Sequence, residues 1–188
     1  MPDHITPELF KHVRHAVERV CHGSFENDKL ILTEADLEFR VCAELLNSNI
    51  QAIDDSAVHI HAQTNFLKTN DKLGWKPDIV LIPSAQYTVS EDGDLTHRKG
   101  YTHWGSAIAL ELKVLRKNHN TPTILKSVVG DLEKLSQIRD THYGAVDPVH
   151  NFLSAAVVLC RKALPDSHVQ VIQDTGRELD IPVWLFNK

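Results

Sequence analysis

Residues 78–82 form an almost uninterrupted apolar run, and no other feature of the sequence constrains the fold as strongly. A strand that faces water on one side alternates polar and apolar residues, whereas this run is typical of a strand covered on both faces. Residues 107–115 and 152–160 are also rich in aliphatic side chains, and residues 57–62 alternate. The pattern predicts an α/β fold, in which helices pack on a mixed β-sheet.

Threonine residues mark three expected helix starts. Thr6-Pro7 suits the N-cap and first helical position, and Gly23 is expected just past the end of this helix. Thr33 opens a sequence that resembles a capping box, with Asp36 in place of the usual Glu, and Thr121-Pro122 opens the third helix. The apolar residues at helical spacing predict the buried stripes: Leu9, Phe10, Val13, Val17, Val20 and Cys21; Leu37, Val41, Leu45 and Leu46; Ile124, Val128, Leu132, Leu135 and Ile138.

The remaining segments complete a single expected domain, residues 1–188. Residues 169–179 fit a helix, and residues 183–186 fit a short strand that Pro182 would place at a sheet edge or a strand start. The polar residues 84–106 contain a good hairpin turn and indicate an inserted hairpin or loop rather than a second domain. The expected element order is α, α, β, β, β, α, β, then α and β.

Charge and composition exclude several classes of protein. The chain has 20 Lys and Arg against 25 Asp and Glu, which excludes a general basic coat for nucleic acid but allows a local basic patch. No apolar run approaches the ~18–20 residues of a membrane helix, and the first residues lack a signal-peptide pattern. The three cysteines form no CxxC pair, so we expect reduced thiols in an intracellular, cytoplasmic protein without membrane contact.

Charged residues inside two apolar strands are the strongest chemical signal. Asp78 opens one strand, and Glu111 and Lys113 share one side of another because residues two apart in a strand point the same way. Charges in a core strand are unfavourable unless they are paired or bind a metal. If the strands are neighbours, Asp78 can lie beside Glu111, and oxygen ligands favour Mg²⁺ or Mn²⁺. The alternative is a strand-start cap at Asp78 and a solvated ion pair between Glu111 and Lys113.

Pro77-Asp78 and Glu111-Leu112-Lys113 resemble the motif of the PD-(D/E)XK nuclease superfamily, which includes type II restriction endonucleases and archaeal Holliday junction resolvases. The superfamily core has the order α-β-β-β-α-β, which matches the expected elements from about Thr33 to Cys160. The resemblance implies a restriction-endonuclease-like αβββαβ core, here with an extra N-terminal helix, and metal-dependent hydrolysis of nucleic acid.

The resemblance also implies roles for individual residues. Asp78 and Glu111 would bind Mg²⁺ or Mn²⁺, with the backbone carbonyl of Leu112 as a further ligand. Lys113 would orient or activate the attacking water and stabilise charge on the phosphate. The superfamily often adds a glutamate from the first core helix, for which Glu38 is our choice and Glu34, one turn earlier on the same face, is the rival.

Other polar residues are weaker candidates. Arg116 and Lys117 follow the motif and are candidates for contacts to the nucleic-acid backbone, although a solvated strand end is equally consistent with them. Lys134 or Gln137 on the following helix can point into the site, and the sequence does not choose between them. The pair His59 and His61 can bind a transition metal, but a solvated strand face is the favoured interpretation because no third ligand is placed.

The sequence therefore predicts a Mg²⁺- or Mn²⁺-dependent nuclease, with DNA endonuclease activity as the first choice. Cutting both strands needs two sites, which favours a homodimer, and the absence of phosphate-loop and dinucleotide-binding motifs predicts no nucleotide cofactor. The alternative is a catalytically silent nucleic-acid- or protein-binding module of the same fold, acting as a subunit of a defence or repair complex. The sequence leaves DNA versus RNA open.

Overall fold

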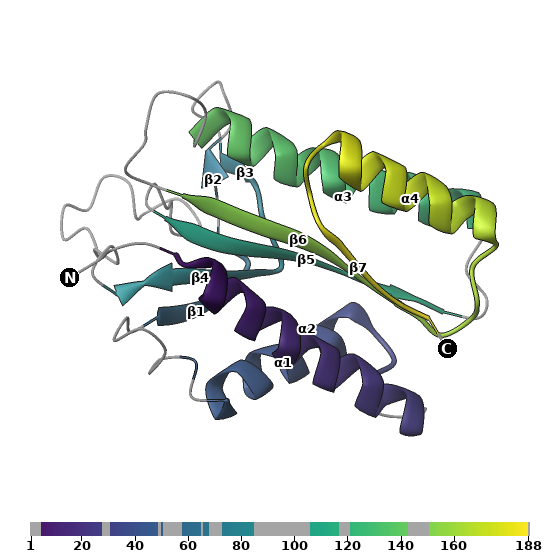
Figure 1. The fold of residues 1–188 in the computed structure, drawn as a ribbon, viewed down its shortest axis with the longest axis horizontal. Helices are drawn as coiled ribbons and strands as arrows, with labels where there is room; N and C mark the ends of the chain where they lie inside the picture. The colour runs from purple at the N-terminus through teal and green to yellow at the C-terminus, as the bar shows by residue number, and fades with distance from the viewer. Residues whose placement is uncertain are drawn as a thin grey trace.

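The computed structural model describes residues 5–27, 31–48, 50, 58–64, 66–67, 73–84, 106–116, 121–142 and 151–187. These residues form four helices and seven strands (Figure 1). In chain order they are α1 (Pro7–Glu26), α2 (Glu34–Asn47), β1 (Val58–Ala62), β2 (Phe66–Leu67), β3 (Leu73–Trp75), β4 (Ile79–Pro83), β5 (Ala107–Leu115), α3 (Thr121–His142), β6 (Phe152–Cys160), α4 (Asp166–Glu178) and β7 (Val183–Asn187).

Five of the strands form one mixed sheet in the order β1-β4-β5-β6-β7. The pairs β1–β4 and β4–β5 are antiparallel, whereas β5–β6 and β6–β7 are parallel. Helices α1 and α2 cover one face of the sheet, and α3 and α4 cover the other (Figure 1). The elements from α2 to β6 follow the α-β-β-β-α-β order when the separate β2–β3 hairpin is set aside. The predicted α/β class and core order are confirmed.

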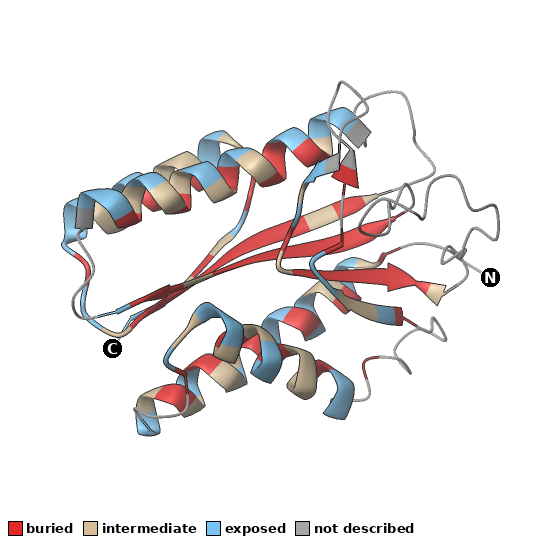
Figure 2. Cartoon of the chain, turned by 180° about the vertical axis from the view of Figure 1, so that it is seen from behind, coloured by how far each residue is buried: buried red, intermediate tan, exposed pale blue. Residues whose placement is uncertain are grey.

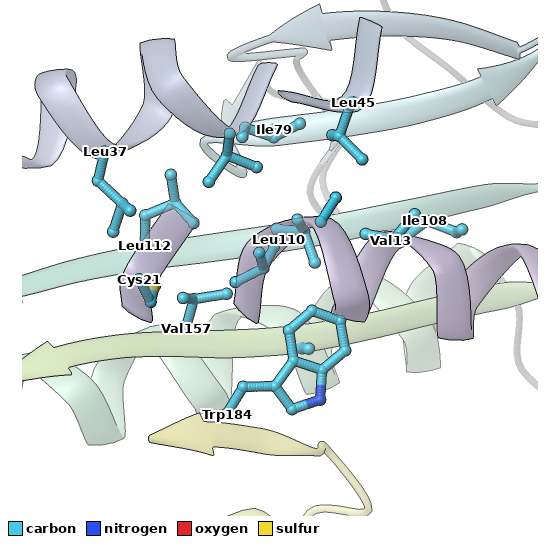
Figure 3. Packing of buried hydrophobic residues seen from close by; sticks show 14 of the residues in the cluster. Val13, Cys21, Leu37, Leu45, Ile79, Ile108, Leu110, Leu112, Val157 and Trp184 are labelled. Atoms are coloured by element: carbon cyan, nitrogen blue, oxygen red, sulfur yellow. The ribbon is translucent and has the colours of Figure 1, made fainter. Parts of the chain in front are cut away.

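The sheet separates two hydrophobic clusters, one under each helical layer. In β5, Ile108 and Leu110 belong to the cluster beneath α1 and α2, whereas Ala109 belongs to the cluster beneath α3. Figure 3 shows the first cluster, with Leu37, Val13 and Trp184 converging on β5. All five residues of β4 are buried, which confirms a strand covered on both faces. In Figure 2 the central strands are almost entirely in the buried class.

The predicted helix starts match the structure. The Thr6 side chain accepts a hydrogen bond from Leu9 N–H, and Pro7 is the first residue of α1. Thr33 and Asp36 form the reciprocal capping box: Asp36 N–H donates to Thr33 Oγ1 at 3.1 Å, and Thr33 N–H donates to Asp36 Oδ2 at 2.8 Å. These caps satisfy backbone donors that the first helical turn leaves without partners. The C-terminal strand β7 is an edge strand that begins directly after Pro182, also as predicted.

Three sequence expectations are wrong. Gly23 does not follow α1 but lies inside it, because buried Ser24 donates to Cys21 O and continues the helix to Glu26. Leu46 is 59% exposed, since Leu37, Val41 and Leu45 at i, i+4 and i+8 already define the inward face of α2. The β2–β3 hairpin was not expected, because strands of two and three residues are too short for alternation to reveal.

Part of the predicted insertion, residues 85–105, lies outside the described residues, as does Lys117. Among the described helices, none combines the length and the hydropathy that crossing a bilayer requires.

Two glycines provide a test of how α3 and α4 pack. A Cβ added at Gly176 would lie 2.6 Å from Val183 Cγ2 and 2.8 Å from the Ile181 carbonyl, so Gly176→Ala is expected to destabilise the fold by roughly 1–3 kcal/mol. A Cβ at Gly130 would meet nothing within 4 Å, so Gly130→Ala should stabilise α3 by about 0.5–1 kcal/mol. Urea unfolding measures both, and equal effects of the two substitutions would contradict the packing of α4 on β7.

Candidate functional site

The candidate site lies where β4 begins and β5 continues past it. Ile79 pairs with Leu110, and extending this antiparallel register by one residue places Asp78 opposite Glu111. Side chains directly opposite in an antiparallel pair lie on one face, with Cβ atoms about 4.5–5.5 Å apart. This face is the one that α3 covers, because Leu110 and Leu112 take the opposite face. The structure thus brings Asp78 and Glu111 together on the α3 side of the sheet.

The Asp78 carboxylate accepts the hydrogen bond that the backbone of a neighbouring strand would otherwise accept from Leu112. Leu112 N–H donates to Asp78 Oδ2 at 2.7 Å. The N–H and C=O groups of one strand residue point to the same side, as the paired bonds of an antiparallel ladder require. The Leu112 carbonyl therefore also points toward the Asp78 side, away from β6. This orientation suits the predicted role of that carbonyl as a metal ligand.

Glu111 is buried at 3% exposure in the middle of β5. Its Oε1 atom lies 2.5 Å from Lys134 Nζ on α3, which is an ion-pair distance. This contact with an ammonium group partly opposes the rise that burial causes in the pKa of Glu111. Lys134 Nζ also donates to the Lys76 carbonyl at 3.2 Å, just before Asp78. The sequence left two residues of α3 that could point into the site. Lys134 does so, whereas Gln137 is exposed.

Lys113 lies on the same side of β5 as Glu111, as predicted. Its ammonium group contacts carboxylates other than that of Glu111. Its Nζ atom lies 3.3 Å from Glu34 Oε1 and 3.1 Å from Asp131 Oδ2. Burial alone would lower the pKa of Lys113, but the charges of Asp131 and Glu34 outweigh it and raise that pKa. Lys113 is therefore held as an ammonium group between α2 and α3.

Both α2 glutamates reach the site, each in a different way. Glu34 contacts Lys113 directly. Glu38 is half-buried, and burial together with the nearby charge of Asp78 raises its pKa. The electrostatic effect of Asp78 on Glu38 places the two carboxyls near each other. Glu38 is thus coupled electrostatically to Asp78, and Glu34 contacts Lys113.

Crowded carboxyl groups dominate the electrostatics of the site. Burial raises the pKa of Asp78, although the Leu112 N–H bond and Lys134 partly oppose the rise. Burial also raises the pKa of Glu111 to about 8, against the lowering effect of Lys134 and with a further rise from Asp78. Carboxyls with raised pKa values that share a site are typical of functional centres, although structural ion pairs perturb pKa values as well.

The donor set suits a hard divalent cation. Asp78, Glu111 and the Leu112 carbonyl supply oxygen atoms only, which Mg²⁺ and Mn²⁺ prefer. The buried Oε1 of Glu111 already faces a cation, the ammonium group of Lys134. Within the described part of the chain, no three His, Cys, Asp or Glu side chains gather closely enough to hold a metal ion on their own. Water or substrate would therefore have to complete the coordination, as is usual for Mg²⁺.

The remaining candidates are Arg116 and the histidine pair of β1. Arg116 is exposed beyond the end of β5, five residues after Glu111, which corresponds to roughly 16 Å along a strand. His59 and His61 lie on the edge strand β1 with ring centroids 6.1 Å apart, and burial, with a contribution from His59, lowers the pKa of His61.

Sequence reasoning did not identify Asp131 as a site residue. It lies on α3 one turn before Lys134, and its carboxylate contacts Lys113 and approaches Lys134 at 4.0 Å. The only signal in the sequence is its position beside the apolar stripe of the helix.

Comparisons with protein-family models and with curated proteins find no match. Among solved structures, the chain is similar to NucC of P. aeruginosa ATCC27853 (TM-score 0.44) and of E. coli MS115-1 (TM-score 0.46), both in a cAAA-bound form and both 7% identical. Each match covers 80% of this chain, which spans only 62% of the NucC chain. At these TM-scores, the matches carry no argument about the activity of this chain.

The raised pKa of Glu111 predicts how the stability of the metal-free protein depends on pH. Between pH 4.5 and 8 the folded protein retains a proton at Glu111 that the unfolded chain releases, so the free energy of unfolding falls as the pH rises through this window. Since one pKa unit corresponds to about 1.4 kcal/mol, the fall due to Glu111 should be on the order of a few kcal/mol.

Urea unfolding in EDTA across this pH range measures the effect. Glu111→Gln should remove this part of the pH dependence, whereas Glu133→Gln, at an exposed position on the same helix as Lys134, should follow the wild type. Parallel stability curves for the wild type and Glu111→Gln would contradict the assignment.

Proposed function

We propose that the chain is a divalent-metal-dependent nuclease that hydrolyses phosphodiester bonds of nucleic acid, with DNA endonuclease activity as the specific form. One observation carries the proposal: Glu111, buried in a central strand, lies opposite Asp78 at the point where β4 begins. A pair of carboxylates in this arrangement is electrostatically unfavourable without a cation. The PD-(D/E)XK motif on these same residues supports the chemistry.

Asp78, Glu111 and the Leu112 carbonyl would hold Mg²⁺ or Mn²⁺. When bound, the ion supplies Lewis-acid chemistry, lowering the pKa of a water molecule and neutralising charge at phosphorus. The Leu112 N–H bond fixes the Asp78 carboxylate, leaving its other oxygen available to the site. Glu38 adds a third carboxylate from α2, near Asp78.

Lys113 would donate hydrogen bonds to the phosphate oxygens and orient the attacking water. Glu34 and Asp131 hold its ammonium group from two helices, so the donor is positioned before the substrate arrives. Fixed donors that face the place where negative charge develops stabilise the transition state strongly. Arg116, just past the end of β5, would contact the nucleic-acid backbone, as would Lys117, the next residue in the sequence.

A plasmid cleavage assay tests the proposal. With Mg²⁺ or Mn²⁺ the wild type should nick or cut the plasmid, and EDTA should abolish the reaction. Glu111→Gln should reduce cleavage at least about a hundredfold, because the several kcal/mol that a bound metal contributes are lost. Glu133→Gln, at an exposed position on α3, is the matched control and should retain full activity.

The possible results separate the hypotheses. Cleavage that persists in Glu111→Gln would show that the nuclease is a contaminant or uses another site. If calorimetry detects Mn²⁺ binding to the wild type but not to Glu111→Gln, while no cleavage occurs, the metal site stands and the plasmid is the wrong substrate. If neither binding nor cleavage occurs, the nuclease proposal is wrong and a silent binding module is left.

The proposal includes a homodimer, because one chain has a single site and cutting a duplex needs two. Phe39 and Leu46 support it: they lie seven residues apart on one face of α2 and are 74% and 59% exposed. Large exposed apolar side chains that share a face are typical of an interface.

Sedimentation velocity tests the dimer. The wild type should sediment as a dimer, and Phe39→Ser should sediment as a monomer with an unchanged circular dichroism spectrum. Val171→Ser, at an exposed apolar position on α4, should leave the dimer intact. A monomeric wild type, or a dimeric Phe39→Ser variant, would refute this interface.

A further inference from the structure

Lys134 lies in the position that a cation bound to Glu111 would take. Its Nζ atom is 2.5 Å from Oε1 of Glu111, whose side chain is buried. A Mg²⁺ or Mn²⁺ ion binds a carboxylate oxygen at about 2.0–2.2 Å. An ammonium group and a divalent ion on one oxygen would be neighbours of like charge in a partly dry site, where their repulsion is strong. Glu111 Oε1 can therefore hold one of the two cations at a time.

The surroundings of Lys134 allow it to leave Glu111. Its side chain is 24% exposed, so it has a path to solvent, and a lysine stem of four methylene groups rotates readily. Asp131 Oδ1 lies 4.0 Å from Nζ and can receive the ammonium after a small rotation. The Lys76 carbonyl, at 3.2 Å, already holds Nζ at the mouth of the site. The displaced charge thus keeps acceptors close to its present position.

The second lysine of the site has no such freedom. Lys113 Nζ lies between Glu34 Oε1 and Asp131 Oδ2, at 3.3 and 3.1 Å, and is held from two different helices. Neither of these partners is Asp78 or Glu111, so Lys113 does not compete for the oxygen atoms that would bind metal. The two lysines therefore have different functions, although they lie on either side of Asp131.

We propose that Lys134 is a displaceable counter-ion, which contacts Glu111 in the metal-free protein, pairs with this carboxyl once it is ionised, and moves toward Asp131 and solvent when a divalent cation binds. The inference rests on the proposed function, because it assumes that Glu111 is a metal ligand. It explains why a carboxylate buried at 3% exposure is tolerated before metal arrives. It makes Lys134 a positioning residue for the metal-free state rather than a group that touches the phosphate.

Amine-reactive labelling of the full chain, quantified residue by residue by mass spectrometry, tests the displacement. Lys134 should react slowly in EDTA and several-fold faster at saturating Mn²⁺, because its ammonium group leaves Glu111. Lys126, an exposed lysine two turns earlier on α3, is the internal control and should react equally in both conditions. In Glu111→Gln, Lys134 should react rapidly with or without Mn²⁺.

Mn²⁺ calorimetry on the same samples separates the two levels of the proposal. If Mn²⁺ binds but the labelling of Lys134 stays constant or slows, the displacement is refuted and the metal site remains. If Mn²⁺ does not bind, both the metal site and the displacement are refuted. A metal-dependent rise at Lys126 equal to that at Lys134 would reflect a general change in α3 and would also overturn the inference.

Discussion

The ion pair between Glu111 and Lys134 is the interaction on which the arrangement of the site depends. A charge in a strand covered on both faces costs several kcal/mol unless an opposite charge reaches it. Lys134 provides that charge from α3, and this contact orients the helix so that its polar border faces β5. The neighbouring apolar stripe of α3, from Ile124 to Ile138, then packs on the same face of the sheet. One helix thus supplies both the hydrophobic cover and the counter-charge.

The offset between β4 and β5 creates the space that the site uses. The pairing of the two strands ends at Ile79 and Leu110, whereas β5 continues to Leu115. Beyond this point Leu112 N–H has no strand partner on the β4 side and donates to Asp78 instead. The Asp78 carboxylate therefore accepts the hydrogen bond that a β4 carbonyl would otherwise accept, so the Leu112 N–H keeps a partner. The same replacement leaves the Leu112 carbonyl facing the site, so one local irregularity positions two of the proposed metal ligands.

The sequence predicted what local rules determine. Period-two alternation placed Glu111 and Lys113 on one face of β5, and threonine caps located the starts of α1 and α2. It did not predict that Lys113 pairs with Asp131 or that Lys134 pairs with Glu111, because these contacts depend on how α3 is rotated over the sheet. Gly23 failed as a helix end for a related reason: packing around Ser24 overrides the preference of a single residue.

The charges of the cluster argue that it is more than a structural ion-pair network. Among the described residues, the ion pairs of the cluster involve two ammonium groups, those of Lys113 and Lys134. The carboxyl groups around them outnumber these two: Asp78, Glu111, Asp131, Glu34 and Glu38. A network that served stability alone would be expected to balance its charges, and apolar residues of similar volume often stabilise a core better than buried ion pairs. Burial is the largest cause of the raised pKa values of Asp78, Glu38 and Glu111, and neighbouring carboxyl groups raise them further. A divalent cation would offset this excess of carboxyl groups where it is greatest, between Asp78 and the buried oxygen of Glu111.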